Sequence, residues 1–90
     1  MEQNVEKILN EKELEQVAGG AQKLGRALIF NCQHRCNARK GPGTEYEKWG
    51  YAYAGKVYDF YGWTNGWAML KIDGYYKYVF KDFVMIIDHD

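Results

Sequence analysis

The chain has 90 residues, no formal net charge at pH 7, and an aromatic content of 17%. This length allows one small domain, near the lower limit for a core that is stable without a staple such as a disulfide. No run of about 18 apolar residues is present, so no membrane-spanning helix is expected. The sequence contains no serine, which excludes a serine nucleophile.

The neutral average hides two different segments. Residues 1–20 hold two Lys and five Glu, a net charge of −3, and no aromatic residue. The remaining ten basic and seven acidic residues give residues 21–90 a net charge of +3, and this segment holds every Trp, Tyr and Phe. We therefore expect two parts, an N-terminal segment of residues 1–20 and a folded domain of residues 21–90.

The N-terminal segment predicts a short, acidic helix over about residues 11–18. Asn10 is a good N-cap with Glu13 at the N3 position, and Leu9 and Leu14 occupy the positions of a hydrophobic staple. The helix would be marginal alone in water, because so short a helix does not recover its nucleation cost. A glycine pair ends the segment, and the basic and apolar regions of a Sec-type signal peptide are missing.

This segment resembles the double-glycine leader of bacteriocin-type secreted peptides. The resemblance rests on six positions: Leu9, Glu13, Leu14, Val17, Gly19 and Gly20. It implies that the peptidase domain of an ABC exporter binds the leader as an amphipathic helix and cuts after the second glycine. The mature protein would then be secreted. The alternative is an ordinary N-terminal helix with a glycine C-cap, retained by an intracellular adaptor.

Residues 21–90 predict an all-β domain of short antiparallel strands. Strands are expected at 27–32, at 57–61 and at 67–72, the last lying between two hairpin turns, Asn65-Gly66 and Asp73-Gly74. Residues 75–80 should pair back, 81–83 should turn, and 84–87 should complete the sheet. Strands of this length, rich in Tyr and Trp, indicate a small β-barrel. We expect its core to depend on aromatic residues. Alternation, together with the family resemblance described next, selects four core residues: Tyr58, Phe60, Trp67 and Val79.

Residues 27–86 resemble the bacterial SH3 domain. The resemblance rests on residues 37–44, "NARKGPGT", and on these later positions: Tyr46, Gly50, Gly55, Gly62, Asn65, Gly66, Trp67, Tyr78 and Val79. It implies an SH3-like barrel that recognises cell-wall peptides or peptidoglycan. Cys36 and Ala52 replace larger core residues of the family, and Trp49 is expected to fill the space that they leave in the core. Lys77 replaces a glycine of the family.

The segment "CQHRC" is the strongest candidate for metal or thiol chemistry. Cys32, His34 and Cys36 supply three ligands with no suitable fourth, so we predict no metal or cofactor. A nucleophilic cysteine needs a histidine positioned by the fold, so we predict no catalysis. Two alternatives remain, a Cys32–Cys36 disulfide or two separate thiols. The disulfide requires a turn at 33–35, because residues four apart in a strand are about 13 Å apart and the limit is roughly 7 Å.

These inferences favour a secreted binding module without enzymatic activity. Aromatics interleaved with Lys and Arg suit nucleic acid, but a charge of +3 without a basic stripe counts against that partner. Cell-wall peptide or peptidoglycan is the expected ligand, and a bacteriocin-like peptide acting on other cells is the alternative.

In SH3-like barrels the long first loop and a later hairpin loop flank one groove, so the resemblance implies a ligand site there. It comprises Asn37, Arg39, Tyr46 and Trp63. The two aromatic residues would grip a peptide or sugar, and the two polar residues would hydrogen-bond to a peptide backbone or carboxylate. The competing interpretation is that Asn37 and Arg39 only brace the loop and that exposed Tyr is ordinary sheet surface.

Overall fold

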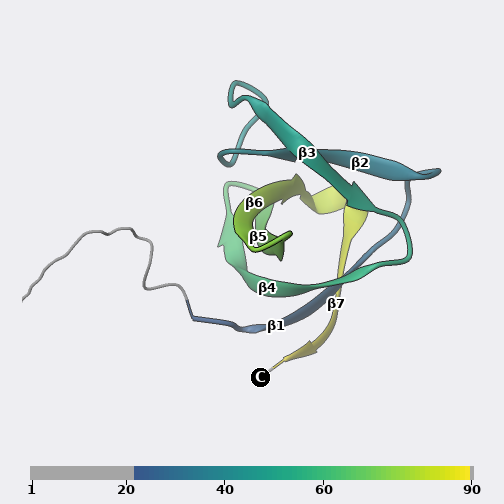
Figure 1. Ribbon diagram of the computed structural model, residues 1–90. Helices are drawn as coiled ribbons and strands as arrows, with labels where there is room; N and C mark the ends of the chain where they lie inside the picture. The colour runs from purple at the N-terminus through teal and green to yellow at the C-terminus, as the bar shows by residue number, and fades with distance from the viewer. Residues whose placement is uncertain (1–21, 90) are drawn as a thin grey trace, which may run out of the picture.

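The computed structural model describes residues 22–89 (Figure 1). The predicted helix of residues 11–18 and the six leader positions lie outside the described residues. In the described part, no helix is long and apolar enough to cross a membrane.

The described residues form seven strands and one turn of 3₁₀-helix. In chain order these are β1 (Gly25–Ile29), β2 (Arg35–Arg39), β3 (Lys48–Tyr53), β4 (Val57–Thr64), β5 (Trp67–Ile72), β6 (Tyr75–Phe80), η1 (Lys81–Phe83) and β7 (Val84–His89). The prediction of an all-β domain with short antiparallel strands is confirmed, and β5 and β6 have their predicted bounds. No strand was predicted for residues 35–39 or 48–53, which form β2 and β3.

The two predicted hairpin turns are confirmed by their backbone conformation. Asn65 and Gly66 have φ angles of 54° and 79°, and Asp73 and Gly74 have φ angles of 55° and 85°. Two consecutive residues with positive φ define the type I′ turn, whose twist matches that of the flanking strands. The second turn fixes the register of β5 and β6, which pair without a break from Trp67 opposite Phe80 to Ile72 opposite Tyr75.

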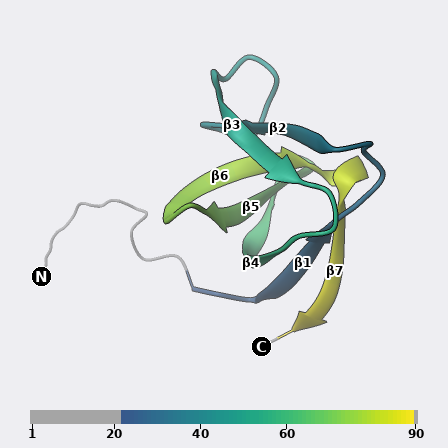
Figure 2. The same ribbon diagram turned by 45° about the vertical axis from the view of Figure 1, so that its right-hand side comes forward.

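All seven strands belong to one antiparallel sheet, in the order β3-β2-β6-β5-β4-β1-β7. The sheet curls, so that β5 and β6 lie between the β2–β3 hairpin on one side and β4, β1 and β7 on the other (Figures 1 and 2). It is not closed into a barrel, because no ladder joins its end strands β3 and β7 within residues 22–89. The expected barrel closure is therefore corrected to a curled open sheet. Within the described residues, one ladder pair, Arg39 opposite Tyr78, joins the β2–β3 hairpin to β6, and buried side chains of the hairpin pack into the common core.

The core is built mainly from small and aliphatic side chains. Its fully buried members include four alanines and the larger Ile29, Leu70, Ile72 and Val79. Three of the four predicted core residues are buried, Phe60, Trp67 and Val79, at 4%, 7% and 0% exposed, and Tyr58 packs half-buried against the core. The expectation that aromatic residues carry the core is wrong, because the other buried apolar side chains are not aromatic. The alanines that face the interior, which let the strands approach closely, are Ala27, Ala38, Ala52 and Ala68.

Trp49 does not refill the core beside Cys36 and Ala52, as was expected. It is half-buried and lies outside the core cluster, with its ring centroid 4.7 Å from Nζ of Lys77 and 5.1 Å from the ring of Tyr75. Lys77 is the one buried charged side chain among the described residues. Trp49 therefore covers a buried ammonium group, which the negative face of an aromatic ring stabilises.

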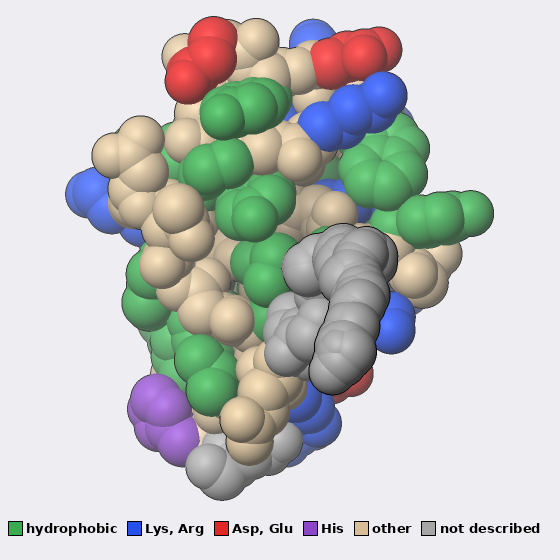
Figure 3. Space-filling view, turned by 90° about the vertical axis from the view of Figure 1, so that its left-hand side faces the viewer, with side chains coloured by type: hydrophobic (Ala, Val, Ile, Leu, Met, Phe, Trp, Pro, Cys, Tyr) green, Lys and Arg blue, Asp and Glu red, His purple; other side chains and the backbone are tan. Residues whose placement is uncertain are grey.

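Most aromatic side chains lie at or near the surface instead. The space-filling view shows hydrophobic side chains forming a band across one face of the domain, with acidic residues at one end (Figure 3). Five aromatic residues are among the exposed large hydrophobic side chains: Phe30, Tyr46, Tyr53, Trp63 and Tyr75.

Candidate functional site

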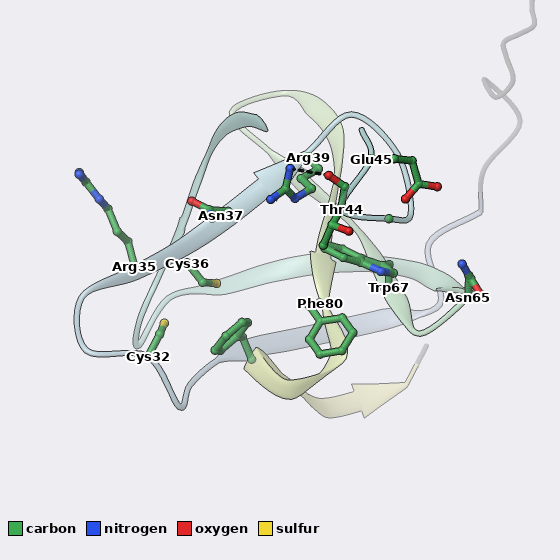
Figure 4. Close-up of a pocket in the computed structure, with 12 residues that line it drawn as sticks. Cys32, Arg35, Cys36, Asn37, Arg39, Thr44, Glu45, Asn65, Trp67 and Phe80 are labelled. Atoms are coloured by element: carbon green, nitrogen blue, oxygen red, sulfur yellow. Dashed lines mark hydrogen bonds between the residues drawn. The ribbon is translucent and has the colours of Figure 1, made fainter. Parts of the chain in front are cut away.

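An open groove with a volume of about 660 Å³ lies over β2, β5 and β6 (Figure 4). Its lining residues come from the bend before β2, from β2, from the loop of residues 40–47, from the Asn65-Gly66 turn, from the β5–β6 hairpin and from η1. They are Cys32, Arg35, Cys36, Asn37, Arg39, Gly43, Thr44, Glu45, Asn65, Trp67, Phe80 and Phe83. The groove thus combines aromatic, amide, hydroxyl and charged groups.

The floor of the groove is aromatic. Trp67 and Phe80 are opposite each other in the β5–β6 ladder, and their ring centroids are 5.2 Å apart with an angle of 60° between the ring planes. Their neighbours Ala68 and Val79 belong to the core, so alternation turns Trp67 and Phe80 to the other face of the sheet. Trp67 is buried, at 7% exposed, as the sequence analysis predicted, and it packs against Phe80 beside the main core cluster rather than within it.

The loop of residues 40–47 forms one wall, and Arg39 holds it in place. Nη1 of Arg39 donates hydrogen bonds to the backbone carbonyls of Thr44, at 3.2 Å, and Tyr46, at 2.8 Å. Nδ2 of Asn65 donates to the carbonyl of Pro42, at 3.4 Å, which ties the loop to the β4–β5 turn. The loop also packs on itself, since a Cβ at Gly41 would clash with the ring of Tyr46. The wall is therefore anchored at both ends and in the middle.

The structure brings two of the four predicted ligand-site residues into the groove. Asn37 and Arg39 line it, and Arg39 also braces the loop, as the competing interpretation predicted. Tyr46 lies in the loop but not in the lining, and it is 43% exposed. Trp63 also lies outside the lining; it is 48% exposed and packs its ring edge-on against Phe60, at 5.4 Å.

Sequence reasoning missed the aromatic floor and most of the loop residues that line the groove. Counting outward from the Asp73-Gly74 turn places Trp67 opposite Phe80. The predicted turn was therefore sufficient to predict this aromatic pair. The contribution of Phe83, Thr44, Glu45 and Asn65 depends on how distant loops pack, which no local pattern indicates.

Cys32 and Cys36 lie at one end of the groove as free thiols. Residues 31–34 form a bend, which supplies the turn that a disulfide would require, and the two sulfur atoms point toward one another (Figure 4). Burial raises the pKa of the Cys36 thiol to about 12, and the charge of Cys32 and a hydrogen bond with Cys32 add to this rise. Cys36 is therefore a neutral thiol at physiological pH.

Residues 22–89 contain no group of three or more His, Cys, Asp or Glu side chains placed to hold a metal ion. No protein-family model, curated protein or solved structure matches the chain. Function is therefore inferred from the residues and geometry of the groove.

The raised pKa of Cys36 predicts slow alkylation in the folded protein. At pH 8.5, iodoacetamide should modify Cys36 at least about 100-fold more slowly in the reduced, folded chain than in the urea-unfolded chain, because only the thiolate reacts. Peptide mass spectrometry over time measures both rates.

The raised pKa of Cys36 also makes the free energy of unfolding depend on pH. The neutral Cys36 thiol contributes fully to stability below pH 9.0, and this contribution is lost as the pH rises toward about 12.

Cys32→Ala is the control for this experiment, because burial is the largest cause of the raised pKa. Cys36 should stay slow in this variant. Equal rates of Cys36 alkylation in the folded and unfolded chain would contradict the burial of this thiol.

Proposed function

We propose that residues 21–90 form a secreted, non-catalytic module that binds cell-wall peptide or peptidoglycan in the groove over β2, β5 and β6. The observation that carries this proposal is the groove itself, which has an aromatic floor and a polar rim. Apolar walls with a few well-placed polar groups are typical of ligand sites, and a volume of about 660 Å³ suits a ligand of a few residues.

The chemistry of the rim suits a peptide. Asn37 and Asn65 carry amide groups that both donate and accept hydrogen bonds, and Thr44 adds a hydroxyl. The rings of Trp67 and Phe80 offer apolar contact to an aliphatic side chain or to the apolar face of a sugar. Because the loop is already held by hydrogen bonds, a ligand would not have to order it, which lowers the entropic cost of binding.

Secretion through a double-glycine leader is the second part of this proposal. Its support is the set of six leader positions, Leu9 to Gly20, which the peptidase domain of an ABC exporter would bind. The described strands begin only at Gly25, so a cut after Gly20 would leave all seven strands intact. The leader and the module are thus separable along the chain.

A bacteriocin-like role, in which the mature domain acts on other cells, is a second candidate. The observation that favours it is the exposure of apolar side chains on the strands away from the groove, which would suit contact with another surface. They are Val57, Met85 and Ile87, each more than 40% exposed. Growth inhibition of neighbouring strains by the purified protein separates this role from wall binding alone.

Titration with peptidoglycan fragments tests the wall-binding proposal. Soluble fragments added to the full chain should shift the backbone amide signals of Asn37 and Arg39 and the indole signal of Trp67, because these groups line the groove. Tryptophan fluorescence should change over the same concentration range. Trp63→Phe, a surface change outside the groove, should leave binding unchanged. Absence of any shift at millimolar ligand would contradict the proposal, and shifts confined to Tyr46 and Trp63 would move the site out of the groove.

The leader hypothesis predicts that Gly20→Val blocks processing, because a branched side chain would clash in a peptidase channel that accepts glycine. The precursor and the variant are co-expressed with a peptidase-containing ABC exporter, and the medium is examined by mass spectrometry. The unchanged chain should yield a product that begins at Ala21, and the variant should yield none. If the variant is cut and exported normally, residues 1–20 are not a double-glycine leader.

A further inference from the structure

Arg39 has hydrogen-bonding capacity that the described structure does not use. Its guanidinium group has three nitrogen atoms, and Nη1 donates to the carbonyls of Thr44 and Tyr46. Within residues 22–89, Nε and Nη2 have no hydrogen-bond partner, and no carboxylate forms an ion pair with Arg39. The two unused nitrogen atoms form the edge of the guanidinium group that binds a carboxylate with two parallel hydrogen bonds.

The position of Arg39 makes this edge suitable for a ligand. The side chain is half-buried, lines the groove and lies beside Thr44 (Figure 4). Its two bonds to backbone carbonyls fix the plane of the guanidinium group before a ligand arrives. Over an aromatic floor, where water is partly excluded, such a charge acts more strongly than on an open surface.

The other charged groups of the groove assign a direction to the ligand. Arg35 lines the groove at the Cys32 end, but its guanidinium group is directed away from Arg39 and lies over the ring of Tyr51, with Cζ 4.0 Å from the ring centroid (Figure 4). Glu45 lies where the loop of residues 40–47 lines the groove, with its side chain against Gly43. Its carboxylate would repel an anion there. A negative group is therefore favoured beside Arg39 and disfavoured beside Glu45.

We propose that the groove binds peptides by a free carboxylate, held by Nε and Nη2 of Arg39. The side chain next to that carboxylate packs on Trp67 and Phe80, and the remainder of the peptide extends toward Glu45. This inference rests on the proposed function, and it adds the ligand class, namely peptides with an unblocked carboxylate.

A matched pair of ligands tests the inference on the full chain. One ligand is a cell-wall stem peptide whose internal carboxylates are amidated, so that its only free carboxylate is terminal, and the other is the same peptide with a terminal amide. The carboxylate form should bind at least about tenfold more tightly, because a charge-assisted, two-point contact is lost in the amide. It should also shift the Nε–H signal of Arg39 in the NMR spectrum, and the difference between the ligands should shrink at high salt.

The outcomes separate the two proposals. Equal affinity for the two peptides would overturn the carboxylate site and leave the binding groove standing. Binding of neither peptide would overturn both the carboxylate site and the wall-peptide proposal.

Two variants locate the effect. Arg39→Gln should reduce the carboxylate-to-amide affinity ratio to about one, and Lys56→Gln, at an exposed cation outside the groove lining, should retain the ratio. Because Arg39 also holds the loop, Arg39→Gln is expected to weaken binding of both peptides, but the ratio within one variant is independent of that loss. A ratio that persists in Arg39→Gln would overturn the assignment to Arg39.

Discussion

The hydrogen bonds from Arg39 to the carbonyls of Thr44 and Tyr46 determine whether this domain has a groove. The loop of residues 40–47 contains two glycines and a proline and forms no strand or helix of its own, so its position depends on such ties. The Lys40–Glu47 ion pair, at 3.2 Å, is solvent-exposed and contributes little. Because folding already orders the loop, the entropy lost in ordering it does not weaken the binding of a ligand.

The small core explains why the aromatic residues are available for binding. Four alanines are fully buried, and the curled strands close around them, so large rings find little space inside. Alternation then turns Trp67 and Phe80 to the opposite face of the hairpin, where they line the groove together with the loop. Trp49 also lies outside the core cluster, over the ammonium group of Lys77. The small side chains of the core thus leave the aromatic rings of Trp67 and Phe80 in the groove, where a ligand can contact them.

The sequence predicts the parts of the fold that local chemistry decides. Asn65-Gly66 and Asp73-Gly74 tolerate positive φ, so they mark two turns and set the bounds of β5 and the start of β6. β2 and β3 escape prediction because their inward residues are small and give no clear apolar alternation, and because Gly50 has a φ of 87° within β3. The open edge of the sheet depends on pairing between distant strands, which no local pattern specifies.

The sequence likewise predicts only the part of the candidate site that depends on neighbouring residues in the chain. Asn37 and Arg39 follow from the loop that comes directly after them, and the structure places both in the groove. Tyr46 and Trp63 flank the expected loops in sequence but lie outside the groove lining, because packing against Gly41 and Phe60 decides where their rings lie. The unused donors of Arg39 become visible only once the loop carbonyls are located.

The most direct test of this account is amide hydrogen exchange at Lys40, whose N–H donates to the carbonyl of Glu47 at 3.0 Å and closes the base of the loop. If Arg39 holds the loop, Arg39→Gln should reduce the protection of this amide by about tenfold or more, since two hydrogen bonds are lost. Arg35→Gln should leave it unchanged, and the amide of Leu70 in β5 serves as the reference for global stability. Unchanged protection of Lys40 in Arg39→Gln would show that the loop, and with it the groove, does not depend on Arg39.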